Sequence, residues 1–124
     1  FKLLPRDKPI LMLNLVKFRH EAKYPDGEPL SGAEAYARYG KASAPVFERV
    51  GGSIVWRGRP ENVLIGPSDE QWHAAFIAHY PTASAFLAMV TDEEYRKAVK
   101  HRQAAVETSR LIRIAELPLS GKFA

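Results

Sequence analysis

The chain has no cysteine among its 124 residues, and this absence excludes several kinds of chemistry. Without cysteine there is no disulfide framework, no thiolate nucleophile and no zinc site with sulfur ligands. Because a chain without cysteine fits a reducing compartment, we expect a cytoplasmic location.

Long apolar runs and clustered charges are missing as well. The longest unbroken apolar run is Ala85–Val90, which is too short to cross a bilayer. The formal net charge is +4, but basic and acidic residues are interspersed along the chain. A nucleic-acid surface would instead carry a basic stripe with interleaved aromatic residues. We therefore expect neither a membrane nor a nucleic acid as a partner.

The familiar catalytic signatures do not occur. There is no Gly-x-Ser-x-Gly elbow, no phosphate-binding glycine loop, no dinucleotide fingerprint and no helical pair of zinc-binding histidines. These absences argue against hydrolases, kinases and nicotinamide-dependent enzymes, and we predict no cofactor.

What the chain does contain is a regular succession of apolar patterns, which predicts one domain over residues 1–124 with a core of about 9–117 and a tail at 118–124. The predicted strands are 9–18, 53–59 with a continuation at 62–66, 72–80 and 109–117. The predicted helices run from Gly32 to a break near Ser43 and Ala44 imposed by Pro45, from Pro45 to Val50, from Thr82 to Val90, and onward to about Thr108.

Local signals set the helix ends. Ser31–Glu34 and Thr91–Glu94 have the spacing of capping boxes, in which the first side chain and the fourth residue satisfy each other's backbone donors. Thr82 is suited to an N-cap, and Gly51–Gly52 is a typical helix stop.

The order β-α-β-β-α-β predicts the ferredoxin-like α+β fold, with an antiparallel four-stranded sheet and helices on one face. The first strand, 9–18, is apolar on both faces, yet one helical layer covers only one of them. The other face should be covered from outside the chain, and we expect a homodimer in which two open sheet faces meet. The alternative is a hydrophobic ligand that fills one face of a monomer.

Several short motifs resemble one known family. Phe76–Pro81, Ala83–Phe86, Asp92–Tyr95 and Lys100–Arg102, with the earlier Tyr36, Pro45 and Gly51–Gly52, are similar to the family called "domain of unknown function 1330". That family has an acidic residue before Phe-Pro at the end of a strand, whereas His79 and Tyr80 stand there in this chain. The resemblance implies a dimeric α+β barrel, a group with cofactor-free monooxygenases, muconolactone-type isomerases and haem enzymes. It implies fold and dimerisation far more than a reaction.

Tyr95 and Arg102 are the first candidate pair for a ligand site. They lie seven positions apart and so share one face of the last predicted helix. Arg102 could anchor a carboxylate or enolate, with Tyr95 as a hydrogen-bond donor that could also take part in catalysis. The structural alternative is an Arg102 side chain that reaches water or pairs with a carboxylate such as Glu48.

Two histidines alternate onto one face of the third predicted strand. His73 and His79 are six positions apart, about 20 Å along a strand, so they cannot bind one metal ion, and we predict no metal site. His79 is the candidate general base, because its side chain can exchange protons near neutral pH. If this face lines the inside of a dimer barrel, His79 would lie beside Asn14. If it faces the helices, the histidines are structural.

Asn14 and Trp56 complete the candidate set. Asn14 is an amide on a predicted buried face, so it either orients a ligand or bridges backbone groups. Trp56 either walls an aromatic cavity or belongs to the core or an interface. The connection 19–30 carries a turn at Tyr24–Gly27 and is long enough to be a lid or merely a mobile loop.

These observations favour a small homodimer that binds a small anionic or aromatic organic molecule in a barrel cavity. It could act as a cofactor-independent isomerase or a monooxygenase-like enzyme. The alternative is a non-catalytic module for ligand binding or dimerisation. A haem enzyme is a weaker alternative, since His79 and His101 are its candidate axial ligands.

Overall fold

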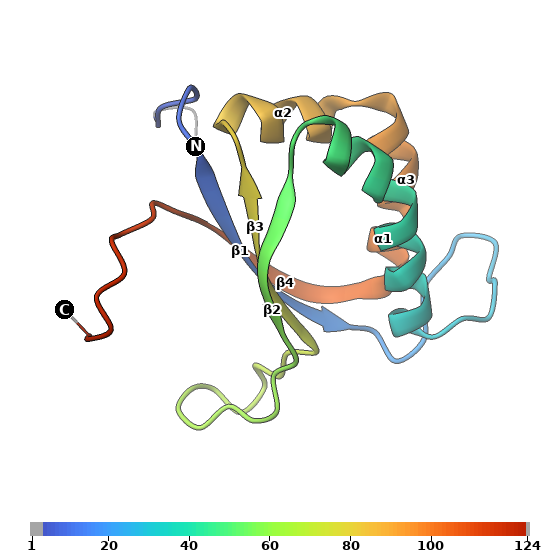
Figure 1. Ribbon diagram of the computed structural model, residues 1–124. Coiled ribbons are helices and arrows are strands. Elements are labelled where there is room, and N and C mark those ends of the chain that lie inside the picture. Colours follow the sequence, from blue (N-terminus) through green and yellow to red (C-terminus); the bar gives the residue numbers. More distant parts are fainter. Residues whose placement is uncertain (1–3, 124) are drawn as a thin grey trace.

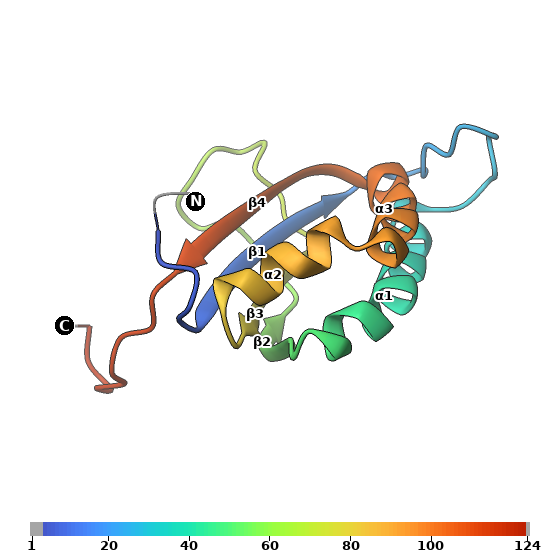
Figure 2. The same ribbon diagram turned by 90° about the horizontal axis from the view of Figure 1, so that it is seen from above.

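The chain forms a four-stranded antiparallel sheet with three helices on one of its faces (Figures 1 and 2). The computed structural model describes residues 4–123. The elements in chain order are β1 (Ile10–Phe18), α1 (Gly32–Arg49), β2 (Ser53–Gly58), β3 (Ala74–Tyr80), α2 (Ala83–Thr91), α3 (Glu93–Ala105) and β4 (Val106–Ile114). The strand order in the sheet is β2-β3-β1-β4. The predicted ferredoxin-like α+β fold is confirmed.

The register of the central strand β1 defines two faces of the sheet. In antiparallel pairs, residues directly opposite each other point to the same side. Ile10 is opposite Tyr80 and Met12 is opposite Ala78, and all four are buried beneath the helices. We call this side the covered face. The alternate residues of β1, beginning at Leu11, are half-buried on the other side, the uncovered face.

The core lies between the covered face and the helices. Val16 of β1 and Val46 of α1 are fully buried and anchor two neighbouring clusters of apolar side chains. The other buried members are Ile10, Met12, Ala35, Ala78, Tyr80, Ala83, Met89, Tyr95, Ala105 and Val106. The helical layer is thus held to the sheet by aliphatic and aromatic contacts from all three helices.

The predicted helix starts agree with the structure except at α3. Ser31 forms its capping box with Glu34, with both hydrogen bonds 3.0 Å long, and Thr82 caps α2. The predicted box at Thr91–Glu94 is wrong, because Thr91 is the last residue of α2. Asp92 is the N-cap of α3 instead, and its carboxylate accepts the backbone N–H of Glu94 at 2.8 Å.

The predicted helix break before Pro45 is also wrong. Helix α1 is continuous from Gly32 to Arg49 with Pro45 inside it, although its ribbon bends along its length (Figure 2). Proline removes the donor for the carbonyl four residues earlier, at Lys41. Both Pro45 and Lys41 are exposed, so water can satisfy that carbonyl, while the next residue, Val46, is fully buried. Burial of the following turn therefore outweighs the lost hydrogen bond.

Several strand boundaries differ from the predictions, and β4 ends at Ile114 instead of at 117. Residues 62–66 are not a strand, because β2 ends at Gly58 and Pro60 has no N–H to donate to a sheet. Strand β3 begins at Ala74 rather than Trp72. Strand β4 begins at Val106, directly after α3, instead of at 109 after a helix that runs to 108. The residue pattern Val-Glu-Thr, rich in β-branched side chains, favours the extended backbone found there.

Candidate ligand-binding site

The sheet separates the predicted site residues into two groups. Asn14 is opposite Phe76 on the covered face, beneath the helices that carry Tyr95 and Arg102. His79 is opposite Leu11, and Trp56 is opposite Ile77, which places both on the uncovered face. The expectation that His79 lies beside Asn14 is therefore wrong, because the backbone of the sheet stands between the two side chains.

Helix α3 directs Tyr95 into the layer between helices and sheet. Asp92 fixes the start of the helix, and Tyr95 follows in the first turn with only 9% of its surface exposed. Its hydroxyl lies 2.7 Å from the hydroxyl of Tyr39 on α1. This hydrogen bond joins α1 to α3 and places two hydroxyl groups at one point of the interior.

Tyr36 and Tyr39 extend the cluster along α1. Their ring centroids are 5.4 Å apart, since the two residues are three positions apart on one helical face. Burial raises the pKa of Tyr36 to about 12, and the positive charge of Arg102 opposes that shift. Burial also raises the pKa of Tyr39, and the neighbouring Tyr95 raises it further. At neutral pH the phenols of Tyr36 and Tyr39 are hydrogen-bond donors, not bases.

Arg102 is half-buried, and its guanidinium has no carboxylate partner among residues 4–123. Its Nη2 donates to the hydroxyl of Ser109 on β4 at 3.2 Å, and its charge acts on both Tyr36 and Tyr39. None of the four ion pairs among residues 4–123 includes it, so the predicted alternative of a pair with Glu48 is absent from this part of the chain. A guanidinium with five donors and one neutral partner retains capacity for an anion.

Asn14 offers a hydrogen-bond acceptor, where Arg102 offers donors. Its Nδ2 donates to the backbone carbonyl of Met12 at 3.1 Å, and within the described residues its side-chain oxygen accepts no hydrogen bond. Asn14 on β1 is opposite Leu111 on β4. The neighbouring pair on the covered face of these two strands is Val16 with Ser109. Asn14 and Ser109, the hydrogen-bond partner of Arg102, therefore lie on the same face of the sheet. Both predicted roles of Asn14, structural and ligand-orienting, fit this placement.

Trp56 belongs to an apolar row that crosses the uncovered face. Directly opposite residues on the four strands are Trp56, Ile77, Leu13 and Ile112. The indole packs over Gly58, where an added Cβ would lie 3.0 Å from the ring. Trp56 and Ile112 are exposed, and no helix covers this row. Its placement fits an interface better than the wall of a cavity.

The two histidines of the β3 region have different surroundings. His73 precedes β3, and its Nδ1 accepts the backbone N–H of Phe18 at 2.8 Å while the two rings stack. This contact satisfies a donor at the irregular end of β1, so His73 is structural. His79 lies between Leu11 and Ser53 on the uncovered face, and no hydrogen bond from a described residue occupies its ring.

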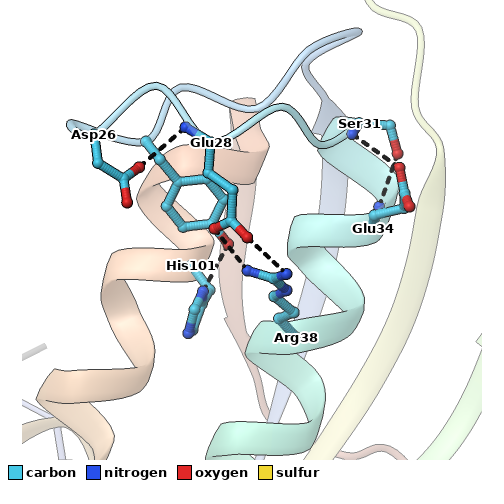
Figure 3. A network of polar contacts seen from close by, with 7 residues as sticks. Asp26, Glu28, Ser31, Glu34, Arg38 and His101 are labelled. Carbon is cyan, nitrogen blue, oxygen red and sulfur yellow. Dashed lines mark hydrogen bonds and ion pairs between the residues drawn. The ribbon is translucent and has the colours of Figure 1, made fainter.

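A second polar network ties the connection 19–30 to the helices (Figure 3). The Tyr24 hydroxyl lies 2.6 Å from Nδ1 of His101, and Glu28 binds Arg38 through two contacts of 2.9 and 3.0 Å. Burial lowers the pKa of His101, and the charges of Lys100 and Arg38 lower it further. These residues line a shallow groove of about 300 Å³. The lid role of this connection stays a prediction, and opening would have to break these contacts.

Tyr39 and Ser109 were missed by the sequence reasoning. A signal for Tyr39 was its i, i+3 spacing from Tyr36, which puts the two side chains on one face of a helix. Ser109 could not be found, because its contact with Arg102 depends on β4 beginning earlier than predicted.

Over residues 4–123, no three His, Asp or Glu side chains converge in a way that could hold a metal ion. No helix in that range is both long and apolar enough to span a bilayer.

The arrangement of sheet and helices defines a ferredoxin-like α+β protein, and comparison with known proteins agrees. The chain belongs to the family described as "Domain of unknown function (DUF1330)", whose model matches residues 30–115. It is 57% identical to RPA0582, a protein of unknown function from Rhodopseudomonas palustris. The match has a TM-score of 0.90 and covers 95% of this chain and 89% of that one.

More distant solved structures share the fold. SnoaB, a cofactor-independent oxygenase from Streptomyces nogalater, is 16% identical with a TM-score of 0.59, over 93% of this chain and 99% of that one. A dimeric protein of unknown function from Bacteroides fragilis is 14% identical with a TM-score of 0.54, over 86% and 94% of the two chains. At these identities the likeness shows the fold alone. No curated protein matches the chain.

Proposed function

We propose that the chain forms a homodimer through its uncovered sheet face and binds one small anionic or aromatic organic molecule per copy between sheet and helices. The observation that supports the ligand site is Arg102, a half-buried guanidinium whose hydrogen-bond partner within residues 4–123 is a neutral hydroxyl. A cytoplasmic location is part of this proposal, and the lack of cysteine supports it.

The surroundings of Arg102 suit a planar anion. The guanidinium can hold a carboxylate, enolate or phenolate through two parallel hydrogen bonds. Tyr36 and the Tyr39–Tyr95 pair offer aromatic faces and hydroxyl donors, and the free oxygen of Asn14 can accept one donor from the ligand. An aromatic carboxylate or phenol would use all three kinds of contact.

The same geometry favours binding over proton abstraction. The pKa values of Tyr36 and Tyr39 are raised, and His79 lies on the other side of the sheet. A general-base role for His79 stays a prediction. From the uncovered face His79 could act on a ligand held between the two sheets of the dimer, but not on a ligand bound at Arg102.

Cofactor-independent oxygenation or isomerisation is the second candidate function, supported by the likeness to SnoaB. Here Arg102 would stabilise the anion of a substrate that is itself acidic, and turnover of oxygen or of the bound compound would distinguish enzyme from binder. Haem binding is the weaker alternative, with His79 and His101 as the candidate axial ligands. The absorption spectrum of the purified protein near the Soret band tests it.

The ligand proposal is tested with a series of aromatic carboxylates and phenols that includes benzoate and salicylate, first by thermal shift and then by calorimetry. We expect Arg102→Met to weaken binding at least about tenfold, the loss typical of one charge-assisted hydrogen-bonding partner. Arg96→Met is the matched control, because Arg96 is an exposed arginine on the same helix. His79→Ala should leave binding unchanged. The site is wrong if no compound binds, or if all that bind do so equally to Arg102→Met.

The dimer proposal is tested by sedimentation at micromolar concentration, where the particle should have twice the chain mass of 13.9 kDa. Ile112→Lys should give monomers, because it adds a charge to the apolar row. Leu111→Lys is the control on the same strand and the opposite face, with 52% exposure against 46% for Ile112. A monomeric wild type, or equal effects of the two lysines, would refute this interface.

A further inference from the structure

The end of the chain carries large apolar side chains that nothing in the described chain covers. After β4 ends at Ile114, the segment 115–123 contains Leu117, Leu119 and Phe123, each at least 81% exposed. We call this segment the arm. Figure 1 shows it leaving the body on the side away from the helices.

The apolar side chains of the arm are spaced so that they can contact one surface together. Leu117 and Leu119 are two positions apart, with Pro118 between them, so they point to one side of an extended chain. Gly121, with a φ of 73°, turns the chain toward Phe123, and the Ser120 hydroxyl stabilises this turn by accepting the Lys122 N–H at 3.2 Å. The hydrogen bonds of the arm join Ser120 to Lys122, within the arm itself.

A second exposed apolar feature lies at the far corner of the sheet. Leu64 and Ile65 form the tip of the loop 59–73 and are 87% and 97% exposed. We call this pair the loop tip. The loop follows the carboxyl end of β2, while the arm follows the carboxyl end of β4, and these strands are the two edges of the sheet. Since β3 runs antiparallel to β2 and in the same direction as β4, the arm and the loop tip leave from diagonally opposite corners.

Diagonal placement means that one copy cannot easily bring its own arm to its own loop tip. Two copies can form two such contacts, each between the arm of one copy and the loop tip of the other. Their two-fold axis then lies in the plane between the two uncovered faces. With the axis along the other diagonal of the sheet, the arm corner of each copy lies over the loop corner of the other. A nine-residue arm reaches up to roughly 30 Å, about twice the width of a four-stranded sheet.

We propose that the arm of each copy packs its three apolar side chains against the loop tip of a second copy, closing both corners of the dimer. This inference rests on the proposed dimer and adds a specific contact to it. It accounts for five large apolar side chains that a monomer leaves in water.

The energetic test compares dimer dissociation constants. The arm variant Leu117→Ser, Leu119→Ser, Phe123→Ser and the tip variant Leu64→Ser, Ile65→Ser should each raise the constant at least about tenfold, because each removes one side of a buried apolar contact. The variant that combines both sets of substitutions should have a dissociation constant little higher than that of the weaker-binding of the two, since both sets delete the same contact. The arm control Glu116→Gln, Lys122→Gln changes the polar positions and should leave the constant within twofold.

The geometric test uses the absence of native cysteine. One copy, without ¹⁵N, carries a nitroxide at Lys122→Cys. It is mixed with a ¹⁵N-labelled copy that carries no nitroxide, so only contacts between the two copies broaden the observed signals. We expect broadening at Leu64 and Ile65. A dimer without that broadening, or with unchanged dissociation constants in the arm and tip variants, overturns the arm contact and leaves the sheet dimer intact. A monomeric wild type overturns both.

Discussion

The hydroxyl oxygens of Tyr39 and Tyr95 lie 2.7 Å apart and join α1 to α3 inside the helical layer. Tyr95 is two helical turns before Arg102, so this hydrogen bond helps to fix the helix that presents the guanidinium to the sheet. The Tyr39 ring also contacts Tyr36, which lies within the field of Arg102. The pair therefore connects the packing of the helices to the geometry of the candidate site.

Replacement of either hydroxyl should destabilise the protein. We expect Tyr39→Phe and Tyr95→Phe each to lower the free energy of unfolding by about 1–2 kcal/mol, because the remaining hydroxyl loses its partner in a buried place. The double variant should lose no more than either single variant, since it leaves no hydroxyl unpaired. Urea denaturation of the four proteins measures this cycle.

Tyr36→Phe is the control for that cycle. Within the described residues the Tyr36 hydroxyl makes no hydrogen bond, so its removal should change stability by less than about 0.5 kcal/mol at neutral pH. Fully additive losses at Tyr39 and Tyr95 would show that the two hydroxyls do not act as a pair.

Stability should fall at alkaline pH because buried tyrosines resist ionisation. The pKa of Tyr36 is about 12, against 10 in the unfolded chain, so between these values the unfolded state releases a proton that the folded state keeps. This tyrosine's contribution is fully present below pH 10 and is lost as the pH rises toward 12. The expected slope is up to about 1.4 kcal/mol per pH unit for one such group.

Lysines and other tyrosines titrate in the same range, so the decisive quantity is a difference between two proteins. Urea unfolding of the wild type and of Tyr36→Phe from pH 8 to 11.5 should give curves that agree below pH 10 and diverge above it, with the variant losing less stability. Parallel curves throughout would show that Tyr36 titrates equally in both states.

Much of the fold was readable from the sequence because its signals are local. The Ser31 capping box, the Thr82 N-cap and the apolar run that forms β1 each depend on a few neighbouring residues, and the structure confirms them. The signals that failed were overridden by contacts between distant segments. Burial of Val46 keeps α1 continuous through Pro45, and pairing with β1 begins β4 at Val106.

The candidate site was only partly readable for the same reason. Periodicity could place Tyr95 and Arg102 on one helical face, but it could not say which face of the sheet lay beneath the helices. That choice separates Asn14 from His79, and it depends on the register of β1 with β3. Side-chain partners such as Tyr39 and Ser109 come from other elements and require the assembled layers.

Two glycines of α1 should respond oppositely to the same substitution. A Cβ on Gly32 would lie 2.0 Å from the Arg19 carbonyl oxygen, so Gly32→Ala must push the connection 19–30 away from the helix start. We expect it to lower the free energy of unfolding by about 1–3 kcal/mol or more, the usual cost of overpacking. Gly40 is exposed in the same helix with nothing within 4 Å of an added Cβ, so Gly40→Ala should stabilise by about 0.5–1 kcal/mol. Thermal or urea unfolding of both variants measures the contrast, and a Gly32→Ala protein as stable as the wild type would mean that the connection does not pack against this helix start in solution.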